Sequence, residues 1–210
     1  MESEKYIEDL AEIRNLMNKS SKFLSLSGIS GVLAGIYALI ATYVINKFVP
    51  ELLSWNYVHI ELLKNSDVLV LISVGLVTLV LAITTGVAIT FFQVRKENET
   101  LWNTGSKLLF TNLMIPLAAG GIFSLILIFK GMIGLIAPVT LIFYGLALVN
   151  GSKYTHEHIK YLGFAEILLG LLATYFVGNG LFFWAVGFGV LHIVYGIYMY
   201  VIPITHQNDI

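Results

Sequence analysis

Long apolar runs recur through this sequence and leave few residues between them. The runs lie at about 24–48, 67–93, 108–129, 131–150, 159–177 and 181–202. The hydrocarbon core of a bilayer is about 30 Å thick, and about 20 apolar residues in a helix cross it. Each run is long enough for that crossing. The sequence therefore predicts an all-α, polytopic membrane protein with six transmembrane helices in a transmembrane domain over 23–203.

The composition of the 210-residue chain supports a lipid environment and excludes several classes of function. Hydrophobic residues make up 57% and charged residues 12% of the chain, whereas soluble domains carry about 25% charged residues. The net charge of −1 provides no basic excess for nucleic-acid binding. Because cysteine is absent, disulfides, thiolate metal sites and cysteine nucleophiles are excluded.

The segment before the first apolar run has the pattern of an amphipathic helix. Tyr6, Leu10, Ile13 and Met17 fall on one helical face. Acidic residues crowd the start of the segment and basic residues its end, which suits the helix dipole, and the pattern is not that of a cleavable signal peptide. We expect a cytoplasmic helix over 1–22 that docks on the bundle, lies on membrane lipids or binds a protein partner.

Positive charges alternate between the connections of the runs and predict the orientation. One set of connections carries Lys5, Arg14, Lys19, Lys22, Arg95, Lys96, Lys107, Lys153 and Lys160. The opposite set carries Lys47, Lys64 and Lys130. Since the side with more Lys and Arg faces the cytoplasm, both termini are predicted to be cytoplasmic, including a short tail over 204–210.

Two hairpins in the second half of the chain look like copies of each other. "IPLAAGG" (115–121) aligns with "FAEILLG" (164–170), and "LIFYGL" (141–146) aligns with "HIVYGI" (192–197). The first hairpin fits the same alignment through its glycines: Gly28 and Gly35 opposite Gly163 and Gly170, and Gly86 opposite Gly145 and Gly196. These hairpins are predicted to be parallel pseudo-repeats, as in some transporters. Their small residues allow close packing within one bundle or in a homodimer.

Two ionisable residues stand out inside the apolar runs. Glu166 and His192 occupy positions at which the preceding hairpin has Leu117 and Leu141. A charged group deep in the bilayer costs at least about 2.5–3.5 kcal/mol, so such residues face the bundle interior and find partners. Their helices are sequential and antiparallel, which makes a contact between carboxylate and imidazole geometrically reasonable.

Two interpretations of this intramembrane polar pair are open. The pair relays a proton or contacts a substrate, or it forms a hydrogen bond that fixes one helix against another. Further polar groups are available to complete its hydrogen bonding: Tyr144, Tyr195, Tyr198 and Asn112. One Glu and one His fall short of a metal ligand set.

Sequence patterns of common enzymes are missing from the chain. It contains no "GxxxxGK[ST]", "HExxH", "GxSxG" or CxxC motif. The sequence therefore predicts no catalytic residue, no cofactor and no metal site.

Three strings of the sequence resemble an uncharacterised six-span family of bacterial inner-membrane proteins that is common in Bacteroidota. They are "SGISGVLAGIYALI" (27–40), "GLIAPVTLIFYGLALVN" (134–150) and "FFWAVGFGVLHIVYGIYMY" (182–200). The resemblance covers nearly the whole chain and implies localisation in the inner membrane and an envelope-associated role. It implies no catalytic residues.

Three hypotheses for the function follow. The leading one is a non-enzymatic envelope component, structural or regulatory, that acts through helix contacts. The second is a small permease or proton-linked channel that uses Glu166 and His192. The third is a membrane enzyme acting on a lipid, for which membrane embedding is the only support.

Overall fold

The computed structural model describes residues 28–50, 65–96 and 102–201, and this part of the chain is helical without a strand. The all-helical fold class predicted from the sequence is confirmed for these residues. The predicted amphipathic helix over 1–22 and the tail over 204–210 lie outside them.

Seven α-helices and four shorter helical turns follow one another along the described chain. The α-helices are α2 (Gly28–Phe48), α3 (Asn65–Lys96), α4 (Thr104–Phe129), α5 (Ile136–Gly151), α6 (Ile159–Tyr175), α7 (Gly180–Trp184) and α8 (His192–Val201). The turns are the 3-10 segments η3 (Ile133–Leu135), η4 (Ser152–Tyr154) and η5 (Val177–Asn179), and the π-helical segment η6 (Ala185–Leu191). The last predicted run is therefore not one uniform α-helix, because η6 joins α7 to α8.

Five helical segments are long and apolar enough to cross a membrane. They are Gly28–Phe48, Asn65–Lys96, Thr104–Phe129, Ile133–Tyr154 and Val177–Val201. The chain is thus a multi-pass helical membrane protein, as its apolar runs predict. The remaining long helix, α6, has 17 residues, which extend roughly 25 Å at about 1.5 Å per residue. That length is shorter than a typical span, so the count of six spans stays a prediction.

Local signals explain where α4 begins and ends. Asn103 accepts a hydrogen bond from the backbone N–H of Ser106, and the Ser106 hydroxyl accepts one from the backbone N–H of Asn103. This capping box satisfies N–H groups that have no partner in the first turn of a helix. After Phe129 the chain reverses at Gly131, whose φ of 72° is readily adopted only without a side chain.

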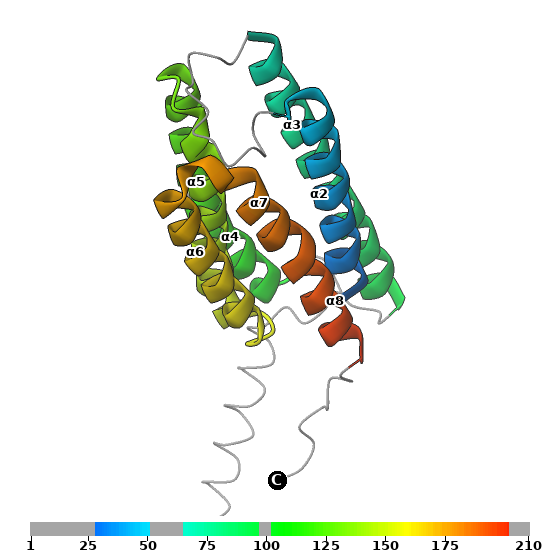
Figure 1. Ribbon diagram of the computed structural model, residues 1–210. Helices are drawn as coiled ribbons and strands as arrows, with labels where there is room; N and C mark the ends of the chain where they lie inside the picture. The colour runs from blue at the N-terminus through cyan, green and yellow to red at the C-terminus, as the bar shows by residue number, and fades with distance from the viewer. Residues whose placement is uncertain (1–27, 51–64, 97–101, 202–210) are drawn as a thin grey trace, which may run out of the picture.

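The helices form two groups that the last segment of the chain joins (Figure 1). In the first group, α5 packs between α4 and α6, and in the second group, α2 packs against α3 and α8. The short helix α7 contacts α5 and α6, whereas η6 contacts α2 as well as α6. The path from α7 through η6 to α8 therefore passes from the first group to the second.

Two pairs of helices approach each other at glycines so closely that their backbones touch. A Cβ atom added to Gly145 would lie 2.6 Å from the carbonyl oxygen of Gly163, and one added to Gly163 would lie 2.8 Å from that of Gly145. Gly28 and Gly196 have the same mutual arrangement, with 2.5 Å from a Cβ on Gly196 to the carbonyl oxygen of Gly28. We call these two interfaces the α5–α6 seam and the α2–α8 seam.

The two seams use equivalent positions of the predicted repeats. Gly170 lies seven residues after Gly163, and Gly35 lies seven residues after Gly28. A Cβ on Gly170 would meet Cγ1 of Ile142, and a Cβ on Gly35 would meet Cγ1 of Ile193, at 2.6 Å in both cases. Lipid is as apolar as the side chains, so helices in a membrane associate through close packing of this kind.

A methyl group at Gly145 should loosen the bundle. We expect Gly145→Ala to lower the free energy of unfolding by about 1–2 kcal/mol, because forcing an extra carbon into a packed interface typically costs about 1–3 kcal/mol. Thermal unfolding in detergent measures the effect. Gly75→Ala is the matched control, since the described residues leave open space around Gly75. Equal unfolding temperatures for the two variants would show that the seam is not tightly packed.

Candidate functional site

Glu166 is buried by the same packing that forms the α5–α6 seam. It lies three residues after Gly163 and four before Gly170, and residues at these spacings share one face of a helix. Its side chain is 0% exposed. A Cβ atom on Gly187 of η6 would lie 2.5 Å from the Glu166 Oε2. Glycine at 187 therefore leaves the room that the carboxyl group occupies.

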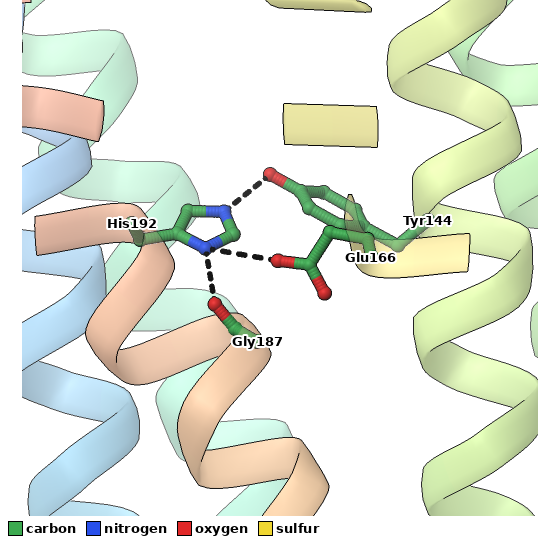
Figure 2. Close-up of polar contacts among 4 residues, drawn as sticks. All are labelled: Tyr144, Glu166, Gly187 and His192. Carbon is green, nitrogen blue, oxygen red and sulfur yellow. Dashed lines mark hydrogen bonds and ion pairs between the residues drawn. The ribbon is translucent and has the colours of Figure 1, made fainter. Parts of the chain in front are cut away.

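His192 begins α8 directly after η6, and three polar groups converge on its ring (Figure 2). Its Nε2 lies 2.8 Å from the hydroxyl oxygen of Tyr144. Its Nδ1 lies 3.0 Å from the carbonyl oxygen of Gly187 and 3.4 Å from Oε1 of Glu166. The first group of helices thus contributes the hydroxyl and the carboxyl, and the last segment contributes the imidazole and the carbonyl.

The partners of the His192 ring fit both of its protonation states. A carbonyl oxygen only accepts hydrogen bonds, so Nδ1 carries a hydrogen and donates it to Gly187. In the neutral ring Nε2 then accepts the hydrogen of the Tyr144 hydroxyl. In the imidazolium Nε2–H donates to the same hydroxyl oxygen, because a hydroxyl both donates and accepts. The ring gains or loses a proton without losing either hydrogen bond.

The carboxyl group of Glu166 is less well satisfied than the imidazole. Within the described part of the chain, neither of its oxygens has a hydrogen-bond partner. The 3.4 Å to the His192 Nδ1 is the ion pair that forms when the ring is protonated. A buried charge without a partner is costly, so the carboxyl is stable here either with its own proton or beside an imidazolium.

Aromatic rings cover one side of this polar cluster. Phe188 of η6 lies against the His192 ring with centroids 5.8 Å apart and planes at 24°. The Tyr144 ring lies 5.0 Å from Phe188, and the Trp184 ring lies 5.1 Å from it. Glu166 and His192 are buried beside these rings, and burial in a medium of low dielectric constant strengthens electrostatic interactions.

The structure brings together three of the residues named from the sequence and places the others elsewhere. Glu166, His192 and Tyr144 form the cluster. Asn112 instead accepts hydrogen bonds from the side-chain amide of Asn150, at 2.9 Å to its carbonyl oxygen and 3.2 Å to its Oδ1.

The other two tyrosines named from the sequence, Tyr195 and Tyr198 of α8, do not hydrogen-bond to the carboxyl. The Tyr195 hydroxyl is buried and has no hydrogen-bond partner among the described residues. The Tyr198 ring stacks on Tyr195, with centroids 6.4 Å apart, and lies 5.8 Å from His158.

Two participants in the cluster escaped the sequence analysis, namely the Gly187 carbonyl and the Phe188 ring. Both belong to η6, and a π-helical turn inside an α-helix often marks a functional site. The available signal was the string "GFG" at 187–189, whose two glycines lie five and three residues before His192 in the last span.

The cluster provides two groups of the kind that bind metals. Among the described residues, His, Cys, Asp and Glu form no group of three or more that could hold an ion. A catalytic zinc ion usually has three protein ligands. A carboxyl group and an imidazole can each bind and release a proton.

Comparisons of the sequence with protein-family models and with curated proteins, and of the structure with solved structures, found no match. The fold defines a helical multi-pass membrane protein. What its polar cluster does must be argued from the cluster's own geometry.

Removing the Tyr144 hydroxyl should destabilise the junction around His192. We expect Tyr144→Phe to cost about 1–3 kcal/mol, because it leaves a buried ring nitrogen without its partner. Thermal unfolding in detergent measures the change. Tyr175→Phe on α6 is the control, since that side chain is 79% exposed, and it should unfold like the wild type. A Tyr144→Phe variant as stable as the control would mean that the 2.8 Å contact contributes little.

Proposed function

We propose that the protein is a small proton-linked permease or channel of the bacterial inner membrane, in which Glu166 and His192 bind and release a proton. One observation carries the proposal. A fully buried carboxyl group without a hydrogen-bond partner among the described residues lies 3.4 Å from an imidazole. The hydrogen bonds of that imidazole suit both of its protonation states.

The unsatisfied carboxyl favours this proposal over a purely structural role. A carboxylate that only fastens helices together is expected to accept hydrogen bonds, because buried polar groups in native proteins are nearly always paired. Tyr144 donates to or accepts from His192 and not Glu166. The carboxyl thus keeps lone pairs available for a proton.

The charge of the cluster links proton binding to motion. With one exchangeable proton, either on the carboxyl or on the ring, the net charge is zero. Loss of that proton leaves one negative charge inside the bilayer, at a cost of at least about 2.5–3.5 kcal/mol. The cost falls if the carboxylate moves to water, so deprotonation favours a rearrangement of α6 against η6.

The packing around the carboxyl suits a cargo as small as a proton. Oε2 lies against Gly187, and the Leu141 side chain also fills the space at that glycine, 2.5 Å from an added Cβ. Leu141 is itself 0% exposed. In this conformation the proton is the species that the carboxyl binds.

The proposal includes the predicted topology of six spans with both termini in the cytoplasm. Here α6 crosses as the shortest span. Basic residues support the orientation. Lys153 and Lys160 flank the start of α6, on the predicted cytoplasmic side. Lys47 at the end of α2 and Lys130 directly after α4 are fewer and belong to the opposite side.

Two other hypotheses from the sequence have less support. The envelope component was expected to bind its partner through the N-terminal helix, and residues 1–22 lie outside the described chain. A lipid-acting enzyme has no observation in its favour beyond membrane embedding. Homodimer formation likewise stays a prediction.

Proton flux into liposomes tests the proposal. Protein reconstituted with a trapped pH-sensitive dye should carry protons down an imposed gradient, and Glu166→Gln should reduce the flux to that of protein-free vesicles. The amide has the shape of the carboxyl and exchanges no proton. His192→Gln should also impair the flux. Glu157→Gln makes the same chemical change at an exposed position before α6 and should leave the flux intact.

Two results would contradict the proposal. One is wild-type protein whose flux equals that of empty vesicles in both gradient directions. The other is flux at the wild-type rate in both Glu166→Gln and His192→Gln.

A further inference from the structure

A third pair of helices, α3 and α4, carries the glycines of a seam and packs together near Val94 and Leu109, but not around those glycines. In the predicted repeats Gly86 of α3 corresponds to Gly145 and Gly196, and Gly121 of α4 corresponds to Gly170. Among the described residues, no atom lies within 4 Å of a Cβ added to Gly86 or to Gly121. The equivalent positions in the two closed seams all meet backbone or side-chain atoms at 3.0 Å or less.

Residues near these two glycines on α3 and α4 are exposed as well. On α3, Leu79 and Ile83 are each 55% exposed, although they correspond to Pro138 and Ile142 of the α5–α6 seam. On α4, Leu125 is 55% exposed, one turn beyond Gly121. The counterparts of Leu79 in the two closed seams, Pro138 and Gly189, are buried, so the third pair leaves uncovered a position that the other two pairs cover.

One substitution within the repeats explains why this third seam is open. Met114 of α4 occupies the repeat position that is Gly163 in α6 and Gly28 in α2, and it is 40% exposed. Both closed seams need glycine there, because an added Cβ would meet the backbone of the neighbouring helix. Methionine carries that Cβ and is flexible only beyond it, so α3 and α4 can approach here only at a wider separation than in the two closed seams.

The polar cluster lies where the first group of helices meets the last segment of the chain. Movement of α3 toward α4 would move the two groups relative to each other at this place. Glu166 and Tyr144 belong to the first group of helices, and His192 begins the helix that packs on α2 in the second group. The open pair consists of one helix from each group (Figure 1). A change in the contacts of His192 therefore changes how the two groups are held relative to each other.

We propose that α3 closes on α4 in a second state of the same chain, forming a third glycine seam, and that the proton on the Glu166 and His192 cluster holds the seam open. Gly86 then lies against Ala118, as Gly145 lies against Ile167. Ile83 lies against Gly121, as Ile142 lies against Gly170. The seam depends on the repeats alone, whereas its response to the proton rests on the proposed function.

The titratable groups around the cluster are few. Tyr144 faces it from α5 and His192 from α8, and Tyr195 lies one turn further along α8. The titratable residues of α2 are Tyr37, Tyr43 and Lys47, and the Tyr37 hydroxyl is hydrogen-bonded to Thr85 of α3 at 3.2 Å. The segments α7 and η6 have no ionisable side chain. Glu166 is thus the one carboxyl group in this set.

Disulfide formation between α3 and α4 tests the closure directly. The native chain has no cysteine, so Leu79→Cys combined with Leu125→Cys creates the only pair and keeps Gly86 and Gly121 in place. These positions correspond to Gly189 and Leu39 of the α2–α8 seam, where a Cβ on Gly189 would lie 2.5 Å from Cδ2 of Leu39. In a closed seam the two Cβ atoms come within reach of a disulfide. Val80→Cys with Ile126→Cys is the control, because each cysteine is shifted by one residue and turned by about 100° around its helix.

We expect an intramolecular cross-link in the first pair and none in the control, in full-length protein in lipid vesicles under a mild oxidant. Adding Met114→Gly should increase the rate of cross-linking. Adding Glu166→Gln should decrease it about fivefold or more at the same pH, as expected for typical coupling between sites, since the amide keeps the uncharged state that holds the seam open.

Failure to cross-link, with and without Met114→Gly, would overturn the closure. Cross-linked dimers in place of monomers would also overturn it, because a second copy would then cover these faces. Cross-linking that Glu166→Gln leaves unchanged would support the seam and overturn its proton dependence. The proposed function itself is decided by the liposome flux and fails on either of the two results given for that experiment.

Discussion

Backbone contact at glycines holds the helices together within each of the two groups. Glu166 is buried on one of these tightly packed helix faces. Gly163 and Gly170 draw α6 against α5, and the carboxyl between them on the same face is fully buried. In lipid, helices gain nothing from burying apolar side chains, so small residues that permit close van der Waals contact decide which helices associate. The polar cluster is consequently located by packing and not by the attraction between its own charges.

The boundary between the groups has a different character from their interiors. Glycine seams fix α5 to α6 and α2 to α8, whereas Tyr144, Glu166 and His192 meet where the chain passes from one group to the other. The hydrogen bonds of the imidazole tolerate the gain of a proton, and the carboxyl does not tolerate its loss without a partner. A boundary that is polar, and neutral only while it holds a proton, is suited to a protein whose two groups move relative to each other.

Much of the fold could be predicted from the sequence because lipid imposes strong constraints on helices. The apolar runs predict the helices, and the glycine spacing at 28 and 35 and at 163 and 170 predicts which faces are equivalent. The contact between Glu166 and His192 followed from their placement on sequential antiparallel helices. The π-helical turn did not, since an extra residue in a helical turn depends on packing against α2 and α6. Nor could the sequence show that Asn112 pairs with Asn150, because the sequence offers several polar side chains that could hydrogen-bond to Glu166 and His192 and does not say which of them do. The N-terminal helix remains a prediction.

Infrared difference spectroscopy of the protein in lipid, taken between acid and alkaline pH, tests the central claim most directly. The account predicts a carbonyl band from a protonated carboxyl group that disappears as the pH rises. The band should be lost in Glu166→Gln and kept in Glu157→Gln. A spectrum in which no buried carboxyl changes its protonation, or in which the same band persists in Glu166→Gln, would contradict the claim that Glu166 exchanges a proton.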